Sequence, residues 1–357
     1  MPQFHSLSVT DIRQETDACV SVAFAIPADQ TDTFIYKAGQ YLTLRTTIDG
    51  EDLRRSYSLC SAPFEKEWRV AIKKVEGGRF STFANEKLKV GDSLQVMAPM
   101  GGFIGGDTEV KHVVCFAAGS GITPVASITK EVLEQYPDAL VTLFYGNKSG
   151  KDIIFREEME GLKNTHLTRL RLYHVLSRED LGTELFFGRL DGEKCSAFAK
   201  TLFDPKSVDA FYLCGPEPMI RAVSESLEAS GTPKDRINFE LFGAPTPPAG
   251  ALKTENTHTT KRQADLSKVS ITYDEKTVTI DMLDDGNHML EAALGYGMEL
   301  PYACQGGVCS TCKCKVTKGE VIMDKNYALE PDEVEAGFVL SCQARPVSAE
   351  VAVTFDV

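Results

Sequence analysis

The sequence predicts a multidomain protein with an antiparallel β-barrel, an α/β domain built on a parallel sheet, and a smaller α+β domain. Three observations support this fold class. The chain has 357 residues, which exceeds the roughly 100–200 residues of one ordinary domain. Its first third reads as short strands, and its middle alternates strands with helices. Four of its ten cysteines lie close together near the C-terminal end.

Residues 1–105 are expected to form the β-barrel. Apolar and polar positions alternate in CVSVAFAI, YLTLRT, RRSYSLCS, WRVAIKKV and DSLQVMA, which are separated by turns that contain glycine or proline. A period of two is typical of strands with one buried face. Repeated short strands with such turns favour a small barrel.

Residues 106–243 are expected to form the α/β domain. The strands HVVCFAA, LVTLFYG, HLTRLRLYHVLS and AFYLC alternate with helices over 123–135, 153–164, 191–202 and 216–230. This alternation implies a parallel sheet covered by helices. The carboxyl ends of the strands should therefore share one edge, where open α/β sheets bind ligands.

A linker over 244–266 is expected to separate the α/β domain from the last domain. Its sequence, APTPPAGALKTENTHTTKRQADL, contains three prolines and no apolar period, so its reach as a coil is on the order of 25 Å. The last domain, 267–357, holds fifteen acidic and seven basic residues. It therefore carries most of the net charge of −13.

The composition favours a cytoplasmic protein whose partners are proteins or small molecules. The N-terminal residues show no basic stretch followed by an apolar run, and no window approaches the roughly 18 apolar residues of a membrane span. The acidic balance disfavours nucleic acid and anionic lipid, because both require a basic face. Cysteines in a reducing compartment are expected to be thiols or metal ligands rather than disulfides.

The cysteine spacing near the C-terminal end predicts a [2Fe–2S] cluster. Cys304, Cys309 and Cys312 follow C-x4-C-x2-C, and Cys342 comes after 29 intervening residues. This is the plant-type spacing, in which four thiolates hold two irons. Glycines and a serine between these cysteines suit a tight loop whose backbone amides turn inward.

A zinc site is the alternative for these thiols. Zinc motifs usually pair two C-x2-C knuckles or use histidine, whereas this region has one knuckle and two isolated cysteines. Cys314 lies where strand alternation begins, and we interpret it as a buried thiol rather than a further ligand.

Two segments of the first domain suit a flavin. In RRSYSL, Arg55 and Tyr57 share one face of a strand, so the tyrosine can lie against a ring system while the arginine pairs with a pyrophosphate. In GGRFST, a basic residue and two hydroxyls open a short helix, which suits a phosphate. FMN has no pyrophosphate, so FAD is expected. The candidate flavin-binding residues are Arg55, Ser56, Tyr57, Ser58, Gly78, Arg79, Phe80, Ser81 and Thr82.

Two turns of the second domain suit a nicotinamide dinucleotide. GSGITP lies between a buried strand and a helix, where glycines let the backbone approach a ligand. CGPEPM ends the last crossover strand in a compact turn, with proline suited to the first helical position. The candidate residues are Gly119, Ser120, Gly121, Thr123, Pro124, Asn147, Lys148, Ser149, Cys214, Gly215 and Pro216.

NADPH is expected rather than NADH. An acidic residue that binds the ribose 2′-hydroxyl is expected at the end of the second strand, but this strand ends in Asn147, Lys148 and Ser149, with Lys151 nearby. Nothing in that stretch repels a 2′-phosphate. Asp152 could still bind a ribose, and an ordinary solvated turn is the other interpretation, so NADH stays open.

The motifs RSYS, GGRFST, GSGITP, YGN and CGPEPM, in that order, resemble the ferredoxin–NADP reductase superfamily. With LPYACQGGVCSTCKCKV, NYALEPDE and GFVLSCQA, the whole chain resembles the reductase components of phenylacetyl-CoA epoxidase, a multicomponent oxygenase of phenylacetate catabolism. The resemblance implies an FAD-binding barrel, an NAD(P)-binding domain and a β-grasp-like ferredoxin domain. It also implies Glu240 near the nicotinamide and Phe242 against the flavin, although this chain continues past that point.

The resemblance implies an NAD(P)H-dependent oxidoreductase that delivers electrons through FAD and the cluster to a di-iron oxygenase component. Ser58, Cys214 and Glu240 are the expected catalytic residues. Nicotinamide donates two electrons at once and the cluster accepts one, which requires a flavin between them. Two alternatives stay open: the reductase of another multicomponent oxygenase, and a non-catalytic electron carrier or redox sensor. The acidic last domain is expected to dock on a basic patch of its acceptor.

Overall fold

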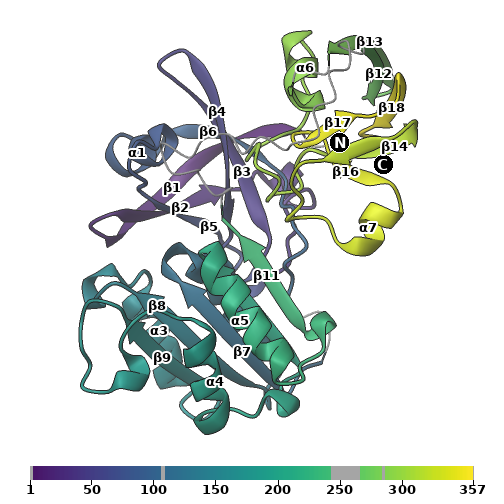
Figure 1. The fold of residues 1–357 in the computed structure, drawn as a ribbon. Coiled ribbons are helices and arrows are strands. Elements are labelled where there is room, and N and C mark those ends of the chain that lie inside the picture. Colours follow the sequence, from purple (N-terminus) through teal and green to yellow (C-terminus); the bar gives the residue numbers. More distant parts are fainter. Residues whose placement is uncertain (1–2, 106–108, 243–265, 284–285, 357) are drawn as a thin grey trace. The chain divides into compact units, whose positions relative to one another are not determined.

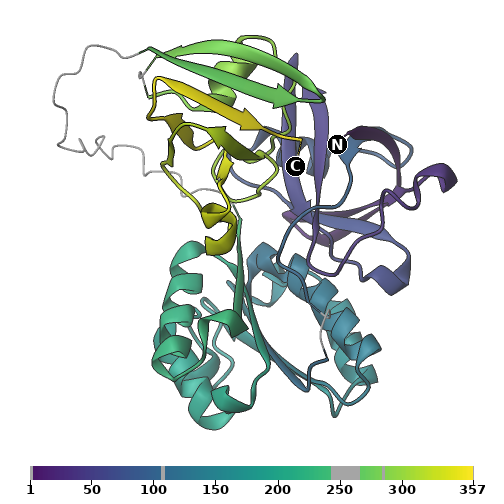
Figure 2. The same cartoon turned by 90° about the vertical axis from the view of Figure 1, so that its right-hand side faces the viewer.

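The computed structural model describes residues 3–105, 109–242, 266–283 and 286–356 (Figures 1 and 2). The chain divides into an N-terminal unit, Gln3–Phe242, and a C-terminal unit that includes Gly243–Val357. Within the N-terminal unit we distinguish a barrel half, residues 3–105, from an α/β half, residues 109–242. The predicted linker over 244–266 lies outside the described residues except for Leu266.

The barrel half is a six-stranded antiparallel sheet in the order β4-β3-β6-β1-β2-β5. A bridge between Leu59 and Val70 joins the segment after β4 to β5, so the two edges of the sheet meet. Apolar side chains that alternate along the strands fill the interior, and α1 packs Phe80 and Ala84 into this core. The elements are β1 (Phe4–Thr16), β2 (Cys19–Ala25), β3 (Tyr41–Ile48), β4 (Glu51–Ser58), β5 (Trp68–Lys73), β6 (Ser93–Met97) and α1 (Arg79–Glu86).

The α/β half is a five-stranded parallel sheet in the order β11-β10-β7-β8-β9. Helices α2 and α3 pack on one face, and α4 and α5 pack on the other. The strands are β7 (His112–Ala118), β8 (Leu140–Asn147), β9 (Leu170–Leu176), β10 (Ala210–Gly215) and β11 (Ile237–Leu241). The helices are α2 (Ile122–Gln135), α3 (Arg156–Thr165), α4 (Gly192–Thr201) and α5 (Glu217–Ala229).

The C-terminal unit is an α+β fold with a five-stranded mixed sheet in the order β13-β12-β18-β14-β16. β12 and β18 run parallel, and the other pairs run antiparallel. Helix α6 packs its buried apolar residues into the core of this unit. The elements are β12 (Leu266–Tyr273), β13 (Lys276–Leu283), α6 (Met289–Gly295), β14 (Lys313–Lys318), β15 (Val321–Met323), α7 (Pro331–Glu335), β16 (Phe338–Leu340), β17 (Ala344–Pro346) and β18 (Glu350–Thr354).

The predicted fold class is confirmed, with differences at particular elements. Strand β1 was not predicted, because only Leu7 and Val9 along its length are fully buried and its apolar alternation is short. Helix α3 begins at Arg156 rather than at 153, because Phe155 has a left-handed backbone with φ of 59°. Among the described residues, no helix is long and apolar enough to cross a membrane.

Candidate functional site

Ser58, the last residue of β4, meets the α/β half at Glu240. The Ser58 Oγ donates a hydrogen bond of 2.9 Å to Glu240 Oε2. Glu240 lies on β11 in register with Cys214 on the neighbouring strand β10. The structure therefore brings the three residues that were expected to be catalytic together, at the point where the barrel half meets the carboxyl edge of the parallel sheet.

Burial controls the protonation of this site. It raises the pKa of the half-buried Glu240 to about 8, while the hydrogen bond from Ser58 acts in the opposite direction. Burial and the nearby Glu240 carboxylate also raise the pKa of Cys214, whose side chain is fully buried. Near neutral pH, Glu240 is therefore mostly an uncharged carboxyl and Cys214 an uncharged thiol.

The other candidate residues of β4 lie on its two faces. The Tyr57 ring is 5.8 Å from the Phe80 ring, which joins the strand to α1. Ser56 Oγ lies 3.1 Å from the Thr43 hydroxyl of the neighbouring strand. Arg55 is exposed, and its guanidinium donates to the carbonyl of Arg54. An exposed cation and a partly buried aromatic ring on one strand suit a ligand with a charged end and a flat ring system.

At the start of α1, one of the two hydroxyls predicted to bind phosphate, that of Ser81, instead forms hydrogen bonds within the turn. Ser81 Oγ accepts from the Val75 amide and donates to the Gly78 carbonyl, each at 3.1 Å. Gly78 has no room for a side chain, because a Cβ there would lie 2.5 Å from Ser81 Oγ. The amide of Thr82 also bonds to the Gly78 carbonyl. No side chain caps the helix, so its first turn keeps the partial positive charge that favours a phosphate.

Arg79 and Phe80 point in different directions from this turn. Phe80 is buried in the core of the barrel half. The Arg79 guanidinium pairs with Glu51 and donates to the Ile48 carbonyl at 2.6 Å, with Asp49 3.6 Å away. Its present anionic partners are therefore carboxylates of the hairpin between β3 and β4.

The two predicted nucleotide turns pack backbone against backbone. Gly119 has a left-handed φ of 54°, and its carbonyl accepts a hydrogen bond from the Tyr145 hydroxyl at 3.0 Å. A Cβ on Gly121 would lie 2.1 Å from the Cys214 carbonyl oxygen, so only glycine fits there. Gly215 is similarly crowded, with 2.7 Å from its Cβ position to the Met219 side chain. These glycines therefore place the two turns side by side.

The remaining residues of the two turns support the helices that follow. Thr123 Oγ1 donates to the Ser120 carbonyl at 3.0 Å. Pro124 is buried in the first turn of α2, and Pro216 precedes α5 with an extended backbone.

Phe242, which was expected to lie against the flavin, follows β11 and is 41% exposed.

The loop after β8 contains an acidic neighbour that sequence reasoning missed. Glu179 follows β9, and its carboxylate accepts a hydrogen bond of 2.7 Å from the Gly150 amide. Lys148 is exposed, and Ser149 Oγ donates to Asp152 at 2.5 Å. Only the pairing of β8 with β9 brings Glu179 to this loop. The negative charge of Glu179 would repel a 2′-phosphate at this loop, whereas the sequence predicted that nothing there does so.

The four predicted cluster ligands come together in the C-terminal unit. Side-chain hydrogen bonds link Cys304 to Cys309 and to Cys342, and Cys312 to Cys342. The Gly306 amide points at Cys304 Sγ, 3.3 Å away. Among the described residues, no group of three or more His, Cys, Asp or Glu side chains forms a ready-made site for a single metal ion. The four sulfurs instead contact one another in a chain, in the order Cys309, Cys304, Cys342 and Cys312.

The loop that carries these sulfurs is tightly turned. Gln305, Gly307 and Ser310 all have positive φ, and the Gln343 side chain donates to the Gln305 carbonyl at 3.1 Å. This conformation turns amides toward sulfur, and four thiols with such donors fit an iron–sulfur cluster. Cys314 is fully buried in the core beside this loop, and burial raises the pKa of its thiol.

Comparison with known proteins identifies the three parts. Residues 7–104 match the oxidoreductase FAD-binding domain, 116–225 the oxidoreductase NAD-binding domain, and 271–347 the 2Fe-2S iron-sulfur cluster binding domain. The chain is 40% identical over 359 residues to a component of the 1,2-phenylacetyl-CoA epoxidase of Escherichia coli strain K12, covering 100% of this chain and 99% of that relative. The chain belongs to the ferredoxin–NADP reductase superfamily, with a C-terminal [2Fe–2S] domain. It is an NAD(P)H-dependent flavin and iron–sulfur oxidoreductase, as predicted.

A second relative and one solved structure are similar over nearly the whole chain. The chain is 32% identical over 351 residues to the ferredoxin reductase component of 3-ketosteroid-9-alpha-monooxygenase from Rhodococcus rhodochrous, covering 98% of this chain and 96% of that relative. Phthalate dioxygenase reductase shares the fold, with a TM-score of 0.61 and 22% identity, covering 99% of this chain and 98% of that one.

Proposed function

We propose that this reductase passes electrons from NADPH through FAD and its [2Fe–2S] cluster to the di-iron oxygenase component of a phenylacetyl-CoA epoxidase in the cytoplasm. The hydrogen bond between Ser58 and Glu240 carries the proposal. It joins β4, the proposed flavin-binding strand (below, the flavin strand), to β11, whose neighbour β10 ends in the proposed nucleotide turn. The name of the relative at 40% identity supports the choice of oxygenase.

The residues of the barrel half would hold FAD at the end of β4. When bound, FAD accepts a hydride and releases electrons singly. Tyr57 would lie against its ring, and Ser58 would hydrogen-bond the ring edge. Arg55, Arg79 and the first turn of α1 would bind the pyrophosphate, for which Arg79 exchanges its present carboxylate partners.

The residues of the α/β half would hold the nicotinamide dinucleotide at the two packed turns. Gly119 to Gly121 would bind its phosphates, while Cys214 and Glu240 would face the nicotinamide. A neutral Glu240 can accept from Ser58 and still donate a hydrogen bond. This arrangement keeps negative charge away from the reacting ring near neutral pH.

The four cysteines would hold two irons in pairs. Cys304 contacts both Cys309 and Cys342, and Cys342 also contacts Cys312. We infer that Cys304 and Cys309 would bind one iron and Cys312 and Cys342 the other, and that the amides of the loop would stabilise the cluster's negative charge.

NADPH is the proposed donor because no acid ends β8 and Lys148 is exposed beside it. The carboxylate of Glu179 works against this choice, since it lies at the same loop. We propose that Lys148 outweighs Glu179, whose charge is partly compensated by the Gly150 amide.

The acidic C-terminal domain is proposed to dock on a basic face of its oxygenase. Exposed acidic residues gather at α7, where Glu330 is the N-cap and Asp332 and Glu335 belong to the short helix. Such complementarity raises association rates and is screened by salt. The proposed domain boundaries are 1–105, 106–243, a linker over 244–266, and 267–357.

Reconstitution with purified oxygenases tests the proposed function. NADPH-dependent epoxidation of phenylacetyl-CoA by the di-iron component should require this protein, and the rate should fall as ionic strength rises. If another oxygenase couples more efficiently, the substrate assignment is wrong while the reductase assignment stands. If no acceptor supports NAD(P)H oxidation, the chain is a carrier or sensor rather than a reductase.

A further inference from the structure

Helix α2 connects the nucleotide turn to the barrel half. The helix begins at Ile122, directly after the Gly119–Gly121 turn. Ser127 and Lys130 are three residues apart and therefore lie on one side of the helix. Ser127 is fully buried, and its Oγ donates a hydrogen bond of 2.6 Å to the Ser61 carbonyl of the barrel half. Helix α2 therefore follows the nucleotide turn directly and contacts the barrel half at its middle.

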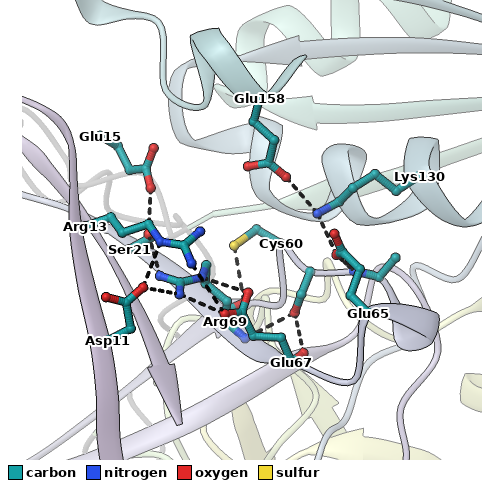
Figure 3. Close-up of polar contacts among 12 residues, drawn as sticks. Asp11, Arg13, Glu15, Ser21, Cys60, Glu65, Glu67, Arg69, Lys130 and Glu158 are labelled. Carbon is teal, nitrogen blue, oxygen red and sulfur yellow. Dashed lines mark hydrogen bonds and ion pairs between the residues drawn. The ribbon is translucent and has the colours of Figure 1, made fainter. Parts of the chain in front are cut away.

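Lys130 lies between one carboxylate from each half (Figure 3). Its Nζ is 2.8 Å from Glu65 Oε2, in the short helix Pro63–Glu65 of the barrel half. It is 2.9 Å from Glu158 Oε1 on α3 of the α/β half. The lysine is only 7% exposed. Burial acts to lower its pKa, but the carboxylates of Glu158 and Glu65 raise it, so the side chain stays charged.

The barrel segment that receives these contacts follows the flavin strand. Ser61 comes three residues after Ser58, and its Oγ donates to the Glu67 carbonyl at 2.7 Å and accepts from the Arg69 amide at 3.1 Å. Arg69 is in turn buried and paired with Glu67 and Asp11 (Figure 3). These bonds hold the segment in place, so the contacts of α2 with Ser61 and Glu65 reach the barrel half a few residues after Ser58.

We propose that Lys130, through Glu65, positions the nucleotide turn against the flavin strand for hydride transfer. This role rests on the proposed function. In that step the C–H bond of the reduced nicotinamide breaks and the hydride passes to the bound flavin, which leaves oxidised nicotinamide and reduced flavin without another reactant. The reacting atoms must lie about 3–3.5 Å apart, and a misplacement of about 1 Å can slow such a step by about 100-fold.

The two carboxylates have different parts in this arrangement. Glu65 belongs to the barrel half, so its contact with Lys130 fixes one half against the other. Glu158 belongs to the same half as Lys130, so its contact compensates charge without crossing between the halves. Lys130 touches neither cofactor site and is a positioning residue rather than a catalytic one.

Matched glutamine variants distinguish the positioning role of Glu65 from the charge-compensating role of Glu158. Glu65→Gln and Glu158→Gln each remove one negative charge within 2.9 Å of the same ammonium group. The amide oxygen in Glu65→Gln can still accept the bond that Glu65 now takes from the Ala62 amide. Lys130→Met removes the cation, Lys130→Arg retains it, and Lys163→Met removes an exposed lysine of α3 as a control.

Anaerobic stopped-flow reduction of the flavin in the purified holoprotein by saturating NADPH gives the readout. Glu65→Gln and Lys130→Met should slow flavin reduction by about 10- to 100-fold, with the nucleotide dissociation constant unchanged. Lys130→Arg should restore most of the rate, while Glu158→Gln and Lys163→Met should match the wild type.

Two results would have different meanings. Equal rates in Glu65→Gln and Glu158→Gln, with both proteins folded and loaded with flavin, would overturn the role of Lys130. A wild-type flavin that no nicotinamide nucleotide reduces would overturn the proposed function instead. If Lys130→Met does not fold, the comparison of the two glutamine variants still decides the question.

Discussion

Ser58 and Glu240 are 182 residues apart in sequence, and their side chains share a hydrogen bond of 2.9 Å. The contact joins the end of β4 to β11, next to the turn after β10. Burial raises the pKa of the half-buried Glu240 to about 8, so its charge changes near neutral pH.

The stability of the protein should depend on pH through Glu240. Its pKa rises from an ordinary 4.5 to about 8 in the folded state, so the folded protein binds a proton between these values that the unfolded chain does not. The stabilisation is fully present below pH 4.5 and is lost as pH rises through about 8. The Tm of the wild type, measured relative to that of Glu240→Gln, should therefore fall as the pH rises from 4.5 to about 8. Parallel Tm profiles would contradict the raised pKa.

Cys309 and Cys314 should behave differently when replaced. Cys309→Ser should lose the iron and the visible absorption of the cluster, because it removes a proposed ligand. Cys314→Ala should keep both, since this thiol is buried in the core, and should lower stability by about 1 kcal/mol through the small cavity it leaves. Iron content and absorbance of both proteins check this. Loss of iron in Cys314→Ala would show that the ligand set is wrong.

Gly121 should not tolerate a side chain. In Gly121→Ala the new Cβ would lie 2.1 Å from the Cys214 carbonyl oxygen, so the two nucleotide turns must separate, at about 1–3 kcal/mol. Gly161→Ala is the matched control on α3, where nothing lies within 4 Å of the Cβ position. That change should stabilise the helix by about 0.5–1 kcal/mol. Equal effects of the two variants on Tm would refute the close packing of the turns.

The preference between NADPH and NADH should respond to charge at the loop after β8. Lys148→Glu should lower the ratio of kcat/KM for NADPH over NADH, and Glu179→Gln should raise it. A surface charge is worth about 1 kcal/mol, which corresponds to about fivefold in this ratio. Steady-state kinetics with both donors measure it. If neither variant moves the ratio, the 2′-phosphate does not bind at this loop.

The sequence was most informative where a pattern is local. Strand β7 was predicted at its observed bounds, 112–118, because a buried parallel strand is a continuous apolar run. The four cysteines were predicted as a set because their spacing matches the plant-type [2Fe–2S] pattern. The glycines of the nucleotide turns were also visible, although the structure shows that Gly121 makes room for Cys214.

Contacts between distant segments could not be predicted. Glu179 reaches the loop after β8 only through the order of the strands. Lys130 lies in the apolar helix ITPVASITKEVLEQ. A cation on a buried helix face indicates a buried ion pair, but it does not identify the partners. Its partners, Glu65 and Glu158, are separated from it by 65 and 28 residues. No periodicity of the sequence relates such positions.

Electrons are proposed to pass from NADPH through the flavin and then through the cluster, and cytochrome c reduction reports on this whole path. The purified protein with NADPH should reduce both cytochrome c and ferricyanide. Cys309→Ser should lose cytochrome c reduction while ferricyanide reduction persists, because the flavin would still be reduced but the cluster would be absent. Cytochrome c reduction at the wild-type rate in Cys309→Ser would contradict a path that runs through the cluster.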